Sequence, residues 1–315
     1  MKRIACLLAA VVVQLGASLD AVALDKLKVA VPQRGAWDAG LADLGQRGGI
    51  FQKHGIELEI LYTQAGPESI QALVAGSVDI ATAAGATSAI GTYSKGAPIR
   101  IIGSEIIGSP DIYWYVPAAS PVKSIKDVNG QTISYSLTGS SSHAGLLALI
   151  AQYGLKVKPT STGSIVSTLT QVMSGQVDIG FSAVPLFLDQ VADGKIRVIA
   201  TGNDVEALKS RTGRVNLTNV ATLQSRRDVL VRFHRAYKET VEWMYTDPAA
   251  LKHFSEYTGQ AIDVVRPVLK LIPKETMAPD KVVGIETIMA EAMALKFIAA
   301  PLTPEQLKEL VQIPE

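Results

Sequence analysis

The chain has 315 residues, of which 48% are hydrophobic and 19% charged, and a formal net charge of +1. This near-neutral balance, without a block of Lys and Arg, argues against a nucleic-acid binder or a binder of anionic membranes. The single cysteine, Cys6, excludes an intrachain disulfide framework, and the length allows a large core and two domains.

The first residues have the layout of a secretory signal peptide. Lys2 and Arg3 precede an apolar run at 4–15, and small residues end in Ala21-Val22-Ala23. The run is shorter than the roughly 20 residues that a membrane-spanning helix requires. We therefore expect residues 1–23 to be removed before Leu24, which leaves an exported chain without cysteine.

The next part of the chain alternates between strand and helix patterns. The expected strands are 27–31, 56–61, 78–81, 99–107 and 113–116, and the expected helices are 38–54, 68–75 and 87–95. Residues 56–61 begin with the period-two alternation of a half-buried strand, and Gly55 and Gly76 end two of the helices. This order predicts an α/β fold built on a largely parallel sheet.

A second unit is predicted to begin near Pro117. It has expected strands at 132–135, 177–181 and 196–200, and helices at 140–153 and 167–174. From residue 222 onward the chain reads as helical, with helices at 225–245, 248–258, 261–271 and 281–293. Pro248 and Pro304 suit first helical turns, whereas Pro267 predicts a kinked or shorter helix.

A weak internal repeat links the two units. Residues 71–80 (QALVAGSVDI) resemble residues 171–179 (QVMSGQVDI), and both read as a helix, a stop and a Val-Asp-Ile strand. Two copies favour two similar α/β lobes over a solenoid, and chance similarity between helix-strand junctions is the alternative.

Three motifs carry a family resemblance: GIFQKHGIEL at 49–58, AGSVDIA at 75–81 and KSIKDVNGQTI at 123–133. In order and spacing the chain resembles the nitrate/sulfonate/taurine group of ABC-transporter substrate-binding proteins, to which the thiamine-pyrimidine synthases look related. The resemblance implies a type II periplasmic-binding-protein fold, with two α/β lobes joined by two hinge strands and a ligand cleft between them. Lobe 1 would comprise 24–111 and 202–315, and lobe 2 would comprise 112–201.

The same resemblance implies a function. We expect a monomeric periplasmic protein that binds a small anionic organic solute and delivers it to an inner-membrane ABC permease and its ATPase. No catalytic residue, metal or cofactor is expected, and no nucleic-acid partner. A thiamine-pyrimidine synthase-like enzyme and a ligand-sensing receptor remain alternatives, the enzyme being disfavoured by the expected export and the lack of cysteine in the mature chain.

Four loops are candidates for the ligand site because each follows a strand and leads into a helix, where ligands of open α/β sheets gather. They are residues 33–37, 83–88, 137–143 and 182–185. The candidate ligand-binding residues within them are Gln33, Trp37, Gly85, Thr87, Ser88, Thr138, Gly139, Ser140, Ser141, His143 and Ser182.

The loop at 138–143 is the strongest candidate. It has four hydroxyl side chains in five residues before a predicted helix, whose N-terminus binds carboxylate or sulfonate groups through free N–H groups. The alternative is that one Ser or Thr only caps the helix. His143 is either a donor to an acidic ligand group or a solvent-facing residue of the first turn.

The other loops give weaker signals. Small residues at 84–86 allow close backbone approach, and a capped turn is the alternative. Trp37 either stacks on the ligand or packs in the core. Ser182 is a candidate only because of its position at the end of a strand. Because Lys and Arg are scarce in these loops, we expect a singly charged sulfonate or carboxylate, or a neutral heterocycle, with Arg34 as the one loop cation.

Overall fold

The computed structural model describes residues 23–315, so residues 1–22 of the expected signal peptide, including Cys6, lie outside the described residues. Its largest sheet has the strand order β2 (Ile56–Thr63), β1 (Asp25–Pro32), β3 (Ile80–Gly85), β10 (Thr212–Asn219) and β4 (Ile99–Ile107). The first three strands are parallel, whereas β10 runs antiparallel to both β3 and β4. β4 therefore runs in the same direction as the first three strands, and the expected α/β fold with a largely parallel sheet is confirmed, with β10 as the one antiparallel strand of this sheet.

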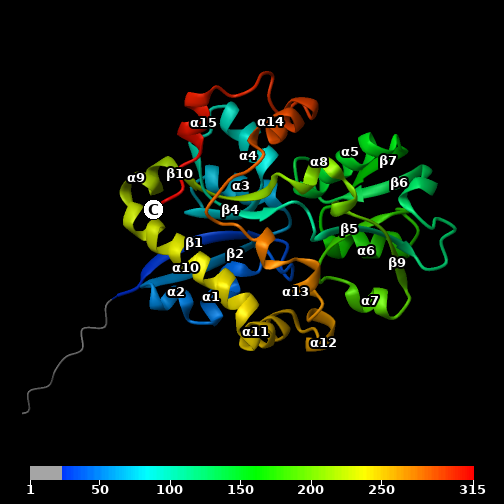
Figure 1. Cartoon of the computed structure of the whole chain (residues 1–315), viewed down its shortest axis with the longest axis horizontal. Helices are drawn as coiled ribbons and strands as arrows, with labels where there is room; N and C mark the ends of the chain where they lie inside the picture. The colour runs from blue at the N-terminus through cyan, green and yellow to red at the C-terminus, as the bar shows by residue number, and fades with distance from the viewer. Residues whose placement is uncertain (1–22) are drawn as a thin grey trace, which may run out of the picture.

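The second group of strands comes from the middle of the chain. β5 (Ile112–Pro117) lies between β8 (Gly180–Ala183) and β9 (Ile196–Thr201) and is antiparallel to both. β6 (Asn129–Tyr135) pairs in parallel with β7 (Lys156–Ser161), and a bridge between Ile133 and Ile179 joins this pair to the segment before β8. Figure 1 shows β5, β6, β7 and β9 beside the larger sheet.

The helices connect and cover these strands. They are α1 (Leu41–Arg47), α2 (Ile50–Lys53), α3 (Gly66–Val74), α4 (Ala86–Ser94), α5 (Ser141–Tyr153), α6 (Ile165–Met173), α7 (Leu188–Ala192), α8 (Glu206–Lys209), α9 (Val220–Ser225), α10 (Arg227–Thr246), α11 (Pro248–Thr258), α12 (Ile262–Val265), α13 (Val268–Leu271), α14 (Ile285–Ala294) and α15 (Pro304–Leu310). We call the elements from β5 to β9 the second unit, the remaining elements the first unit, and the surface where they meet the interface.

Glycine and proline explain most departures from the predicted helices. The helix expected at 38–54 is divided into α1 and α2, because Gly49 adopts the left-handed φ of +72° between them. Pro267 separates α12 from α13, as expected, while Pro248 and Pro304 begin α11 and α15.

Two strands were not predicted. β10 has the sequence TGRVNLTN, in which polar residues alternate with the apolar Val215 and Leu217, yet seven of its eight residues are buried. β7 contains Pro159 and two lysines and is largely exposed, which an edge strand tolerates because it pairs on one side only.

The largest hydrophobic core runs through both units. It includes Val31 and Trp37 from the first unit and Trp114 and Ile179 from the second, all buried. Within residues 23–315, no helix has the length and apolar character that a membrane span requires.

Candidate functional site

The junction of β3 and α4 touches the loop before α5 across the interface. The Ser88 hydroxyl donates a hydrogen bond to the Gly139 carbonyl oxygen. At Gly85, a Cβ atom would lie 3.4 Å from the Ser141 nitrogen and 3.5 Å from the Gly139 oxygen. A larger side chain at Gly85 would therefore meet the backbone of the second unit.

The loop after β1 touches the loop after β8 in the same way. The backbone N–H of Trp37 donates a hydrogen bond to the Val184 carbonyl oxygen at 3.2 Å. Gly35 has a φ of +96°, and a Cβ atom there would lie 3.1 Å from the Leu186 side chain. All four predicted segments thus lie at the interface, where they meet in two cross-unit pairs, although residues 83–88 form the end of β3 and the first turn of α4 and not a loop.

Arg214 of β10 lies at the centre of this interface, and sequence reasoning missed it. Its Nε donates to the Ser141 hydroxyl at 3.2 Å, across the interface. Its two terminal nitrogens donate to Asp38 at 2.5 Å and to Asp111 at 2.6 Å. One buried side chain thus connects the loop after β1, the segment before β5 and the start of α5. Polar residues alternate along 212–218 with the period of two that is typical of a strand, and this pattern was the sequence signal that could have identified Arg214.

The single positive charge of Arg214 lies between two carboxyl groups, and burial raises the pKa of one of them, Asp38, to about 6. Burial alone would lower the pKa of Arg214, but the nearby Asp111 and Asp38 outweigh it and raise this pKa, so the guanidinium stays charged. Asp38 and Asp111 are 1% and 0% exposed, and each keeps one oxygen without a hydrogen-bond partner among residues 23–315. The centre of the interface therefore holds one cation between two carboxyl groups, each with one free acceptor oxygen within the described residues.

Glu105 adds a neutral carboxyl group beneath this cluster. Burial raises the pKa of Glu105 to about 8, so the group is mostly protonated at neutral pH. One of its oxygens accepts hydrogen bonds from the Ala83 N–H at 3.0 Å and from the Tyr237 hydroxyl at 2.7 Å.

The hydroxyl groups before α5 have different roles. Ser140 is the N-cap and accepts from the His143 N–H at 3.2 Å, while Ser142 bonds to Ser136 and to Ser140 within the loop. The capping alternative therefore accounts for Ser140. Thr138 is exposed, and Ser141 is the hydroxyl of this loop that faces Arg214.

His143 supports the loop from within the second unit. Its ring packs on Tyr135 with centroids 4.3 Å apart, and its Nδ1 accepts a hydrogen bond from the Gly139 N–H at 3.3 Å. Burial lowers the pKa of His143, which favours the neutral ring that this acceptor role requires.

Three other predicted residues already have partners within the protein. Trp37 is fully buried, donates from Nε1 to the Tyr245 hydroxyl at 3.1 Å and packs edge-on against Phe254, which are the contacts of the packing alternative. Thr87 donates to Glu291 at 3.1 Å, and Ser182 donates to the Leu186 carbonyl oxygen at 3.1 Å.

A pocket of about 460 Å³ opens at one side of the interface. Its walls come from both units and are lined by Gln33, Arg34, Tyr62, Thr63, Gln64, Ser164, Ile165, Val166, Ser167 and Leu186. The guanidinium of Arg34 lies 5.3 Å from the centroids of the Tyr62 and Tyr257 rings, which restricts its position. Opposite, Ser164 caps the N-terminus of α6.

This pocket combines a cation, side-chain amides and a helix N-terminus. Each of these kinds of group attracts anionic groups in proteins. The loop from β7 to α6 was not among the predicted loops, because β7 itself was not predicted from its polar sequence.

A second groove, of about 510 Å³, opens between α5 and α14. Its walls are mostly alanine and leucine, including Ala144, Leu147 and Ala148 of α5 and Ala290 and Ala294 of α14. Elsewhere among residues 23–315, no group of three or more His, Cys, Asp and Glu side chains is placed to hold a metal ion.

The chain matches a known protein family. The family model described as NMT1/THI5 like matches residues 44–251. No curated protein sequence matches the chain.

Several solved structures share the fold over nearly the whole chain. The alkanesulfonate-binding protein SsuA from Xanthomonas axonopodis pv. citri, bound to MOPS, is 21% identical, with a TM-score of 0.76 over 91% of this chain and 98% of that one. The periplasmic aliphatic sulphonate binding protein SsuA from Escherichia coli is 19% identical, with a TM-score of 0.73 over 92% and 93%. The periplasmic nitrate-binding protein NrtA from Synechocystis PCC 6803 is 13% identical, with a TM-score of 0.70 over 92% and 86%. These similarities establish the periplasmic-binding-protein fold that the motifs implied.

Proposed function

The chain belongs to the NMT1/THI5-like family, and from this membership together with the interface geometry we propose that it is an extracytoplasmic solute-binding protein of an ABC importer. It captures a small anionic organic solute between its two units and releases it to an inner-membrane permease driven by an ATPase. It acts as a periplasmic monomer and does not turn its ligand over.

The observation that carries this proposal is the pocket of about 460 Å³ between the units. Its volume lies within the roughly 300–1,000 Å³ of small-molecule sites. Arg34 supplies a bidentate cation on one wall, and the N-terminus of α6 supplies free N–H groups on the other. A ligand held by both walls favours the closed arrangement.

We propose that the two units are the lobes of a hinged protein, with lobe 1 formed by 24–111 and 202–315 and lobe 2 by 112–201. The cross-unit contacts of Ser88 with Gly139 and of Arg214 with Ser141 would break when the lobes open. Opening and closing about the hinge admits the ligand and then excludes water from it.

We infer a ligand with one negative charge, such as a sulfonate or carboxylate. Arg34 is the loop cation that lines the pocket, and Arg214 is neutralised by two carboxylates. Two solved relatives are described as binding sulfonates and one as binding nitrate, which agrees with a monoanion. In the site, Gln33 lines the pocket, while Gly85, Ser88, Gly139 and Ser141 form the closed contact behind it.

The test is a thermal-shift screen of residues 24–315 against sulfonates, carboxylates, nitrate and pyrimidines. A ligand that binds only the folded state raises the Tm, so one monoanion class should give a clear shift. Arg34→Ala should lose that shift, whereas Arg266→Ala, at the exposed C-cap of α12, should keep it. A shift for pyrimidines alone, followed by chemical change of the ligand, would favour the enzyme alternative.

A further inference from the structure

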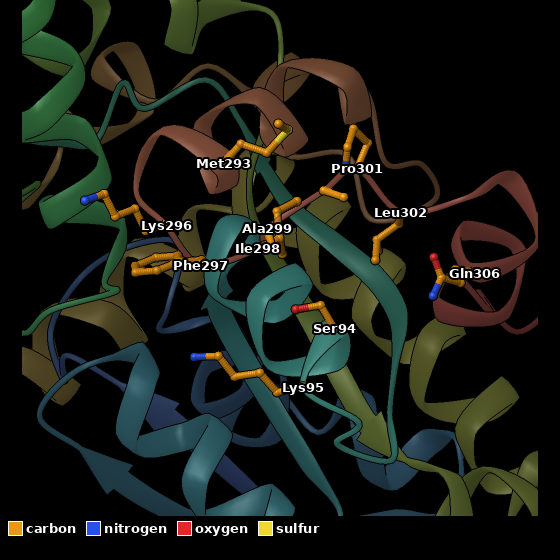
Figure 2. Close-up of a pocket in the computed structure, with 11 residues that line it drawn as sticks. Ser94, Lys95, Met293, Lys296, Phe297, Ile298, Ala299, Pro301, Leu302 and Gln306 are labelled. Carbon is orange, nitrogen blue, oxygen red and sulfur yellow. The ribbon is translucent and has the colours of Figure 1, made fainter.

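A surface pocket of about 790 Å³ lies on the first unit, apart from the interface pocket. It is formed by the end of α4, the end of α14, the segment that follows α14, and α15. Its lining residues are Ser94, Lys95, Met293, Lys296, Phe297, Ile298, Ala299, Ala300, Pro301, Leu302 and Gln306. Figure 2 shows these side chains around the pocket.

The pocket has a cationic end and an apolar floor. In Figure 2 the side chains of Lys95 and Lys296 extend to the same side, away from Leu302 and Gln306. Neither lysine takes part in an ion pair among residues 23–315, and no carboxylate is among the lining residues. Apolar lining comes from residues such as Ile298 and Leu302, which are 6% and 8% exposed.

Lys296 has an unfavourable backbone conformation. It follows α14 with a φ of +58°, which lies in the left-handed region that residues other than glycine seldom adopt. The Lys296 N–H donates to the Met293 oxygen, and the Phe297 N–H donates to the Ala292 oxygen. These are the two hydrogen bonds of a Schellman motif, whose left-handed position is usually glycine.

Other helices of this chain end in the same motif and have glycine at that position. The matching hydrogen bonds and positive φ values occur at Gly76 after α3, Gly96 after α4, Gly175 after α6 and Gly194 after α7. The lysine at the equivalent position after α14 is therefore less favourable for closing the helix than the glycine found at the other four helix ends. Backbone strain of this kind points to a role for the side chain itself.

We propose that this pocket binds a free amphiphilic organic anion, with its acidic group at Lys95 and Lys296 and its hydrocarbon part on Ile298, Pro301 and Leu302. The charge of the lysines is complementary to one acidic head group, and the volume fits a medium-length chain. The site is separate from the interface pocket, so it stands independently of the proposed transport function.

The experiment uses octanoate as the probe and methionine methyl groups as the reporters. In protein labelled with [13C-methyl]methionine, Met293 lines the pocket, while Met173 of α6 is exposed and Met244 of α10 is buried, both outside the pocket lining. Octanoate should shift the Met293 signal in a saturable way and leave the signals of Met173 and Met244 in place. Arg34→Ala should not change this response.

Two variants separate binding from folding. Lys296→Gly should weaken octanoate binding by about two- to fivefold, the size of an exposed ion pair, while relief of the strained φ raises the Tm by about 2 °C. Lys95→Gln should weaken binding to a similar extent without changing the Tm, and Lys270→Gln of α13 should change neither.

Equal octanoate affinity in Lys95→Gln, Lys296→Gly and wild-type protein would overturn the proposal, as would a Met293 signal that does not move. Sedimentation with phosphatidylglycerol vesicles is the final arm. Lysine-dependent binding to vesicles without a response to octanoate would show that the surface recognises a membrane instead of a free anion.

Discussion

Arg214 illustrates how a single residue organises the interface. Its guanidinium neutralises Asp38 and Asp111 within the first unit and reaches Ser141 of the second. A charge this deeply buried is tolerated only with partners, and the partners in turn depend on it. The residue therefore couples the stability of the first unit to the position of α5.

Replacing Arg214 should strongly destabilise the fold. Arg214→Gln leaves two buried carboxylates without their counter-charge, and we expect a loss of about 3–5 kcal/mol in the free energy of unfolding. Arg232→Gln is the control, because Arg232 pairs with Asp25 at a half-exposed position, and there we expect a loss below about 1 kcal/mol. Urea unfolding measures both, and equal losses would contradict the assigned role.

Glu105 should make stability depend on pH. Its pKa is about 8 in the folded chain against an ordinary value of 4.5, so the folded state binds the proton more tightly than the unfolded state. Stability from this group is therefore greatest below pH 4.5 and declines as pH rises toward 8.

Glu105→Gln should remove that decline, because the amide stays neutral and its oxygen can still accept from Ala83 and Tyr237. At pH 8 we expect the variant to be more stable than the wild type by roughly 2–5 kcal/mol. Unfolding free energies at pH 6, 7 and 8 decide the point, and parallel pH profiles for the two proteins would count against a protonated Glu105.

At the scale of elements, the sequence predicts best where pattern and burial agree. β1, β2, β4, β5 and β9 were placed within a few residues, because their apolar runs are bounded by turn residues. β10 was missed since its buried positions include Thr212, Arg214 and Asn216, which only tertiary partners satisfy. β7 was missed since an exposed edge strand needs no apolar face.

The candidate site, like the fold, was predicted only in part. Loops that follow strands were identified by position, and the structure brings all four to the interface. Arg214 of the unpredicted β10 and the wall at 164–167, at the start of α6, lay beyond reach because they join the site only through long-range contacts. The role of Trp37 could not be predicted, because a tryptophan in a loop gives the same sequence signal whether it packs in the core or contacts a ligand.

The contact between the end of β3 and the start of α5 should limit closure. Gly85→Ala adds a Cβ at ordinary contact distance from Ser141 and should retain ligand affinity, whereas Gly85→Leu places a branched side chain against the second unit. We expect Gly85→Leu to weaken the ligand Kd by tenfold or more, about 1.4 kcal/mol, with little change in Tm. Equal affinities for the two variants would show that this contact is not needed for binding.

At the scale of the whole molecule, two α/β units lie side by side and meet through their loops, and the larger of two hydrophobic cores runs through both units. Polar contacts such as those of Ser88 and Ser141 are well suited to a reversible interface, because water replaces them when the units separate. Under the proposed function, the ligand binds in the pocket between the units and thereby favours the closed arrangement.

The central claim is that a small anion binds between the two units. Its most direct test is calorimetric titration of the best thermal-shift ligand into wild-type protein and into Ser141→Trp, whose bulky ring prevents the contact with Arg214 and Gly85. We predict one site per chain in the wild type and loss of measurable binding in the variant, with its fold intact by circular dichroism. Unchanged affinity in a folded Ser141→Trp protein would place the ligand elsewhere and contradict the account.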